Sequence, residues 1–423
     1  MATRPPNGAG LSSALVWVIA LAAILCILVR PRQWPEAVWA CLGALLLFVF
    51  RLISLRDAGT AVAKGSDVYL FLAGMMLLSE LARREGVFDW LACLAVRASR
   101  GSGARLFALV YGVGILVTVF LSNDATAVVL TPAVYAAVRK ARADVLPYLF
   151  ACALIANAAS FVLPVSNPAN LVIYGKSLPA LLPWLRLFML PSIASIAVTF
   201  AVLWVISRRQ LLLPIDEHIA MAGLESRGRR AVWGIGVTGA VLLAASAAGR
   251  DLGVWTFASA TLAVLIATGG RRLAPVVKSV SWSVLPLVAG LFVIVEALQH
   301  ANALDYGRTA LQLMAHLPAA QGSLAASFGV AALSNLMNNL PSGLLTGGAI
   351  AATATPAHLR NALLIGVDLG PNLSVTGSLA TILWLVALRR EGVEVSAGKF
   401  LRTGVLVMPP ALLASTLALL VTS

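Results

Sequence analysis

Small polar side chains interrupt four of the long apolar runs in this chain. The four breaks are Ser122-Asn123-Asp124, Ser166-Asn167-Pro168-Ala169-Asn170, Asn338-Asn339-Leu340-Pro341, and Asp368-Leu369-Gly370-Pro371-Asn372 with Ser374-Val375-Thr376-Gly377-Ser378. Amides donate and accept hydrogen bonds, and a broken helix frees backbone N–H and C=O groups beside them. Because polar groups inside a bilayer are costly without partners, we expect the breaks to converge on one cavity for a small polar solute. The expected binding residues are Asn123, Asp124, Ser166, Asn167, Asn170, Asn338, Asn339, Thr376, Gly377 and Ser378.

Two carboxyl groups within these breaks are candidates for coupling to protons. Asp124 is the ionisable residue at the tip of one break, and its counterpart at the matching tip is the neutral Asn339. A group whose charge changes can exchange a proton for a solute, and an amide cannot. We therefore expect Asp124 to couple transport to protons, unless it only holds the tip through backbone N–H groups. Asp368 is a second candidate, expected in a protein-lined break near Asn157.

Glu80 and Glu296 occupy matching positions near the ends of their apolar runs. Both are further candidates for proton coupling. The alternative is that each carboxylate pairs with basic residues nearby, namely Arg83 and Arg84 for Glu80 and His300 for Glu296. The sequence leaves both interpretations open.

The composition is that of a membrane protein. Hydrophobic residues make up 60% of the 423 residues and charged residues 11%, whereas soluble domains have about 45–50% and about 25%. The net charge of +14 does not indicate nucleic-acid binding, because Lys and Arg form short clusters between apolar runs. Such clusters are typical of cytoplasmic loops. The first run, 11–29, is too long for a cleavable signal and is interpreted as a span.

Signatures of enzymes, cofactors and metals are missing from the sequence. The four Cys residues stand singly, the four His residues form no metal-site spacing, and no phosphate-binding GxxxxGK[ST] motif occurs. We therefore expect neither an enzyme nor a cofactor or metal. Energy for transport has to come from an ion gradient or from a separate ATPase subunit.

Apolar runs that are long enough to cross a bilayer predict most of the architecture. The candidate spans are 11–29, 34–50, 67–82, 146–172, 187–206, 231–249, 254–269, 282–299, 361–387 and 402–421. The runs 106–138 and 323–352 are too long for one span and break in the middle, which predicts re-entrant hairpins. With both termini in the periplasm, the cytoplasmic loops contain 22 of the 31 Lys and Arg residues.

Matched residues predict that the two halves are repeats. Gly74, Glu80 and Asp89-Trp90 match Gly290, Glu296 and Asp305-Tyr306 at an offset of 216, Asn123-Asp124 matches Asn338-Asn339 at 215, and Asn157 matches Asp368 at 211. An odd number of crossings per half makes the second copy inverted. We expect an all-α polytopic protein with about five transmembrane helices, one re-entrant hairpin and one broken helix in each repeat. The first repeat is 1–206 (hairpin 106–138, broken helix 146–172), the cytoplasmic linker is 207–230, and the second repeat is 231–423 (hairpin 323–352, broken helix 361–387).

Several of these stretches resemble the bacterial arsenite efflux permeases (ArsB). The similar segments are Ser122-Asn123-Asp124-Ala125-Thr126-Ala127-Val128-Val129-Leu130-Thr131-Pro132, Met337-Asn338-Asn339-Leu340-Pro341, Gly366-Val367-Asp368-Leu369-Gly370-Pro371-Asn372 and Thr376-Gly377-Ser378-Leu379-Ala380-Thr381-Ile382-Leu383-Trp384. The resemblance runs from about residue 40 to the end. It implies export of arsenite and antimonite across the bacterial inner membrane by proton antiport, with a soluble arsenite-stimulated ATPase as an optional partner.

The substrate chemistry suits this resemblance. Arsenite at neutral pH is mainly an uncharged triol, which amides, hydroxyls and freed backbone groups can bind. One alternative is a sodium- or proton-coupled carrier of dicarboxylates or other anions in the same superfamily, although the breaks contain no Lys or Arg. Another is an intramembrane enzyme that uses Asp124 and Asp368 as paired acids. Matched halves argue against the enzyme, which would not need them.

Overall fold

Helices account for the regular structure of the described residues, as the apolar runs predict. The computed structural model describes residues 6–216, 223–270 and 273–422, and these residues form twenty α-helices joined by short 3-10 and π-helical turns. A helix satisfies its own backbone hydrogen bonds, which is what a segment in lipid requires. The predicted all-α polytopic fold is confirmed. Residues 1–5 of the first repeat and 217–222 of the linker lie outside the described residues.

The helices of the first half are α1 (Pro6–Val29), α2 (Glu36–Val49), α3 (Leu55–Lys64), α4 (Ser66–Arg84), α5 (Val87–Ala98), α6 (Gly103–Phe120), α7 (Thr131–Lys140), α8 (Val145–Ala158), α9 (Pro168–Tyr174) and α10 (Leu181–Leu211). Those of the second half are α11 (Ser226–Ala247), α12 (Leu252–Thr268), α13 (Leu273–Ser279), α14 (Val284–His300), α15 (Ala303–Ala315), α16 (Ala319–Met337), α17 (Asn339–Ala351), α18 (Ala357–Leu369), α19 (Leu379–Arg390) and α20 (Ala397–Thr422). The connection between the halves, 212–225, is shorter than the predicted linker, because α10 and α11 extend into it.

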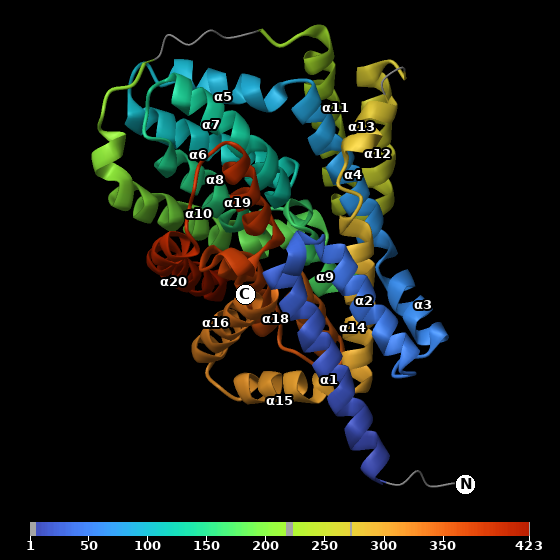
Figure 1. Cartoon of the computed structure of the whole chain (residues 1–423). Coiled ribbons are helices and arrows are strands. Elements are labelled where there is room, and N and C mark those ends of the chain that lie inside the picture. The colour runs from blue at the N-terminus through green and yellow to red at the C-terminus, as the bar shows by residue number, and fades with distance from the viewer. Residues whose placement is uncertain (1–5, 217–222, 271–272, 423) are drawn as a thin grey trace.

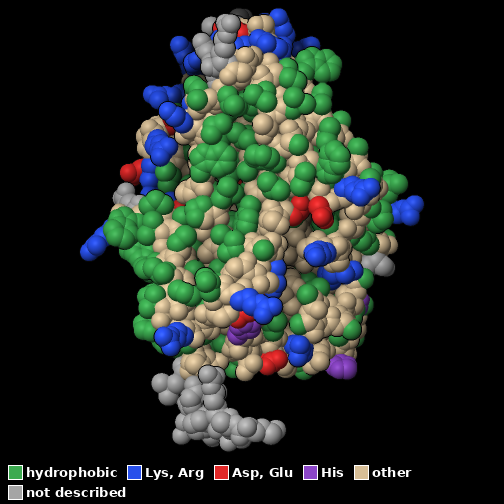
Figure 2. Space-filling view, turned by 90° about the vertical axis from the view of Figure 1, so that its right-hand side faces the viewer, with side chains coloured by type: hydrophobic (Ala, Val, Ile, Leu, Met, Phe, Trp, Pro, Cys, Tyr) green, Lys and Arg blue, Asp and Glu red, His purple; other side chains and the backbone are tan. Residues whose placement is uncertain are grey.

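Among the described residues, five helices are long and apolar enough to cross a membrane, namely α1, α6, α10, α11 and α20. Two bent pairs, α3 with α4 (48°) and α13 with α14 (44°), bring the number to seven. Large apolar side chains such as Leu25, Ile266 and Leu406 are more than half exposed. Figure 2 shows hydrophobic side chains over much of one face, with Lys and Arg at its top, along its edges and in its lower part. Such a surface is suited to lipid rather than to water.

Helices from opposite halves pack closely at matched glycines. A Cβ on Gly74 of α4 would lie 2.7 Å from the carbonyl carbon of Thr256 in α12, and a Cβ on Gly290 of α14 would lie 2.8 Å from that of Ala40 in α2. Small residues allow helix backbones in membranes to approach one another. Gly290 follows Gly74 at the repeat offset of 216, so the two contacts are equivalent in the two halves.

The arrangement in space also fits two related halves. Figure 1 shows α5 lying across the top of the molecule and its sequence counterpart α15 lying across the bottom. Hydrogen bonds close the two matched hairpins at equivalent positions, from Thr118 to Thr126 (2.8 Å) and from Ser334 to Ser342 (3.1 Å). This agrees with inverted repeats, which stay a prediction.

Candidate functional site

The two broken helices, α8–α9 and α18–α19, contact each other at their breaks. Asn167 Nδ2 donates to Asp368 Oδ1 (2.8 Å), and Asn157 Nδ2 donates to Asn372 Oδ1 (3.0 Å). All four side chains are 0–1% exposed. Asp368 therefore lies within protein, directly before the interruption between Leu369 and Leu379.

The first helix of each hairpin hydrogen-bonds to one of the two broken helices. Ser166 Oγ donates to the carbonyl oxygen of Val119 at the end of α6 (3.3 Å). On the other side, Asn335 of α16 donates to the carbonyl oxygen of Gly370 (2.9 Å), and Thr376 donates to the carbonyl oxygen of Asn335 (2.8 Å). Hydrogen bonds thus join the two broken helices to each other, and each broken helix to the first helix of one hairpin, α6 or α16.

Matched residues cap the helices that follow the two interruptions. Asn167 accepts a hydrogen bond from the N–H of Ala169 at the start of α9, and Ser378 accepts one from that of Ala380 at the start of α19. Asn and Ser are favoured at this position because their oxygens satisfy free N–H groups of the first turn. Asn170 Nδ2 contacts the carbonyl oxygens of Ser160, Leu163 and Pro164 at 3.0, 3.4 and 3.3 Å. The polar residues thus also hold the interruptions in shape.

The two hairpin tips differ in detail. In the first, α6 ends at Phe120, and Asn123 accepts a hydrogen bond from the N–H of Asp124 (3.0 Å). Asn123 is buried and Asp124 is half-buried. In the second, the interruption is Asn338 alone, with a positive φ of 78°, and α17 begins at Asn339. The predicted break there extended through Pro341, but a helix tolerates proline in its first turn, where the missing N–H has no helical partner.

Three further candidate site residues lie at the breaks. Asn339 and Gly377 are buried, and Thr376 is half-buried beside Ser374, with 3.0 Å between the two hydroxyls. A Cβ on Gly377 would lie 2.5 Å from Cα of Pro371, so glycine allows the close approach there. The structure therefore places these candidate residues at the breaks, and their role in binding stays a prediction.

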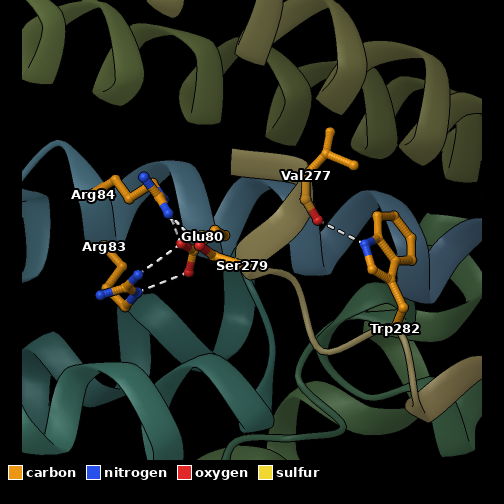
Figure 3. A network of polar contacts seen from close by, with 6 residues as sticks. All are labelled: Glu80, Arg83, Arg84, Val277, Ser279 and Trp282. Atoms are coloured by element: carbon orange, nitrogen blue, oxygen red, sulfur yellow. Dashed lines mark hydrogen bonds and ion pairs between the residues drawn. The ribbon is translucent and has the colours of Figure 1, made fainter. Parts of the chain in front are cut away.

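Glu80 and Glu296 occur in ion pairs at helix ends. Glu80 contacts Arg83 and Arg84 at 2.7 Å each, and Arg84 also bonds to Ser279 at the end of α13 (Figure 3). Glu296 contacts Lys64 at the end of α3 (2.7 Å) and lies 4.0 Å from His300. This geometry favours the pairing alternative. The Glu296–Lys64 pair also connects α14 to α3, and the Arg84–Ser279 bond connects α4 to α13.

A cavity of about 610 Å³ opens between α5 and α7 on one side and α4, α11 and α13 on the other. Its charged lining residues are three cations and three anions, namely Arg84, Lys140, Arg227, Glu85, Asp89 and Glu225. Arg227 lies 3.6 Å from Glu85 and 3.7 Å from Glu225. We call this cavity the vestibule. Its balanced charges do not select for anions or for cations.

Sequence reasoning missed two residues of the network. Asn335 receives a hydrogen bond from Ser374 (2.6 Å), and Ser160 donates one to the carbonyl oxygen of Asn157 (2.8 Å). Asn335 is a single amide in an apolar helix, and an amide in such a place was itself a signal. Ser160 gave no such signal, because a lone serine in a membrane helix commonly bonds to its own backbone.

The sequence profile of the citrate transporter family matches residues 15–370. The chain belongs to the citrate transporter family. Over most of its length the chain is similar to the arsenical pump membrane protein of Yersinia enterocolitica, with 29% identity over 82% of this chain and 84% of that protein. It is also similar to the arsenical pump membrane protein of Escherichia coli K12, with 26% identity over 96% of this chain and 98% of that protein.

One solved structure extends the comparison. The YdaH transporter of Alcanivorax borkumensis covers 95% of this chain and 98% of its own at a TM-score of 0.59 and 16% identity, and so supports the transporter fold alone. The resemblance to the arsenite permeases is confirmed by the similar arsenical pumps. This member of the citrate transporter family is a membrane transporter and not an enzyme.

Proposed function

We propose that the protein exports arsenite and antimonite across the bacterial inner membrane in exchange for protons. The observation that carries the proposal is the buried network of amides and hydroxyls at the two broken helices, which also reaches α6 and α16 of the hairpins. Its single fully buried carboxyl is Asp368, and the breaks contain no Lys or Arg. An uncharged triol matches such a site, because it offers hydroxyls that donate and accept.

Three further observations support an arsenical substrate. The similar proteins of Yersinia enterocolitica and Escherichia coli are called arsenical pump membrane proteins. The vestibule has balanced charges, whereas an anionic substrate such as a dicarboxylate would be attracted by a cationic entrance. The four Cys residues lie outside the breaks. Thiolates bind arsenic(III) tightly, and a transporter without them in its site can release its substrate.

For coupling we propose Asp124 and Asp368, with Glu80 and Glu296 as weaker candidates because they are ion-paired. The proposed orientation places the vestibule and the residues 208–230 and 389–402 in the cytoplasm, with both termini in the periplasm. A soluble arsenite-stimulated ATPase remains an optional partner at that face.

Everted membrane vesicles test the proposal. Vesicles that contain the protein should accumulate radiolabelled arsenite when the lumen is acidic, and collapse of the proton gradient should stop the uptake. Citrate and succinate are the controls for the alternative, an anion carrier. Uptake of either acid without uptake of arsenite would replace the proposed substrate, and uptake that requires sodium would replace the coupling ion.

A further inference from the structure

Asn335 on α16 hydrogen-bonds to both halves of the interruption between α18 and α19. Its Nδ2 donates to the carbonyl oxygen of Gly370 (2.9 Å) and to that of Ala331, one turn earlier on α16 (2.8 Å). Its Oδ1 accepts from the hydroxyl of Ser374 (2.6 Å), and its backbone carbonyl accepts from that of Thr376 (2.8 Å). One residue thus connects the turn that begins the interruption and the turn that ends it to the second hairpin.

The interruption also packs directly against α16 around this amide. A Cβ on Gly370 would lie 2.6 Å from Cα of Ala331, and a Cβ on Gly377 would lie 2.8 Å from Asn335 Oδ1. Both glycines therefore allow an approach that a side chain would prevent. Because these contacts all join the interruption to one helix, the interruption and the second hairpin form one packed unit.

The first interruption is held in another way. At the repeat offset of 215 the counterpart of Asn335 is Phe120, whose side chain has no hydrogen-bonding group. The amide that holds this interruption is Asn170 of α9, which contacts three carbonyl oxygens within 160–164. Its own counterpart at the offset of 211 is Thr381, a buried hydroxyl that lacks a partner among the described residues. The first interruption is thus fastened within its own broken helix, whereas the second is fastened to a hairpin.

We infer that Asn335 is a positioning residue for transport. Its amide fixes the candidate binding residues 376–378 relative to the second hairpin, so that one half of the substrate site is formed before substrate arrives. Groups that are ordered in advance lose less entropy when a ligand binds, which raises affinity. Asn335 acts through the interruption and needs no contact with the substrate. The role in binding rests on the proposed function, because arsenite is the substrate that reports it.

Hydrogen–deuterium exchange of the purified protein tests the positioning without any substrate. Asn335→Val should speed exchange of the backbone N–H groups in 370–378 by roughly 5-fold or more, because both turns lose bonds to α16. It should leave 160–167 at wild-type rates. Asn170→Val is the matched variant and should have the opposite effect on the two segments. Equal acceleration of both segments by either variant, or unchanged exchange in 370–378 with Asn335→Val, would overturn the inference.

Uptake of radiolabelled arsenite by everted vesicles tests the consequence for binding. Asn335→Val should raise KM by roughly 5-fold or more, because displaced groups make weaker hydrogen bonds to the substrate. The maximal rate per transporter, with the amount of protein measured by immunoblot, should stay within about 2-fold of wild type. A purely structural role would lower the amount of folded transporter at an unchanged KM, and that result would overturn the inference.

Ser374→Ala removes one bond of Asn335 and keeps the others, so it remains available if Asn335→Val does not fold. It should raise KM by less than Asn335→Val, and the double variant should fall short of the product of the two increases, because Ser374 acts through Asn335. The full product would contradict this. Ser323→Ala is the control, since Ser323 lies on the same helix and its buried hydroxyl lacks a partner among the described residues. It should leave KM unchanged.

The outcomes separate this inference from the proposed function. Arsenite uptake with a wild-type KM in Asn335→Val contradicts the positioning role and leaves arsenite export standing. No arsenite uptake by the wild-type protein under any gradient contradicts the proposed function, and exchange in 370–378 then still decides whether Asn335 holds the second interruption.

Discussion

The hydrogen bond between Asn167 and Asp368 connects residues 201 positions apart in the two broken helices. Asp368→Leu leaves Asn167 Nδ2 buried without an acceptor, which costs about 1–3 kcal/mol in unfolding free energy. Asn167→Leu leaves Asp368 Oδ1 without its donor at a similar cost, and it also removes the cap of α9, for about 1 kcal/mol more.

The double variant should be destabilised by less than the sum of the two single variants. With both partners apolar, neither leaves the other orphaned and only the lost cap of α9 remains, so we expect a coupling of about 1–3 kcal/mol that offsets the single losses. Asp368→Asn should stay close to wild type in stability, because an amide oxygen can still accept from Asn167.

Equilibrium unfolding in mixed detergent micelles measures these values. The control cycle combines Asp368→Leu with Thr238→Val on α11, and it should be additive to within about 0.5 kcal/mol. Additive losses for Asn167 and Asp368 would show that the two broken helices do not depend on each other through this bond.

Three more predictions concern coupling, packing and orientation. Asp124→Asn should fold and insert but lose arsenite uptake driven by a pH gradient; wild-type uptake by this variant would transfer the coupling role to Asp368. Gly74→Leu should lower the yield of folded protein in detergent chromatography, because its Cβ meets the backbone of α12, whereas Gly112→Leu, with open space, should not; equal yields would contradict the close contact. In a background without cysteine, Gly398→Cys should react with an impermeant maleimide only in everted vesicles and Gly59→Cys only in intact cells; the reverse would invert the orientation.

Much of the fold could be predicted because its signals are local. A run of about 20 apolar residues has to become a helix in lipid, whatever surrounds it. Asn, Pro and Gly mark where such a helix stops, so the interruptions near Asp124, Asn167 and Asp368 were visible in the chain. Exact ends were less visible. At the second hairpin, only the backbone conformation of Asn338 showed that Pro341 belongs to the following helix.

The types of polar residue define what chemistry is available, and the sequence by itself determined that. Amides, hydroxyls and two carboxyls in the breaks specify a neutral, hydrogen-bonding site before any contact is known. Only the tertiary structure decided which group meets which. It paired Asn167 with Asp368 and Asn157 with Asn372, and it gave Glu80 and Glu296 basic partners. Hydrogen-bonding capacity belongs to a residue type, whereas its partner depends on packing between segments some 200 residues apart, which no local pattern encodes.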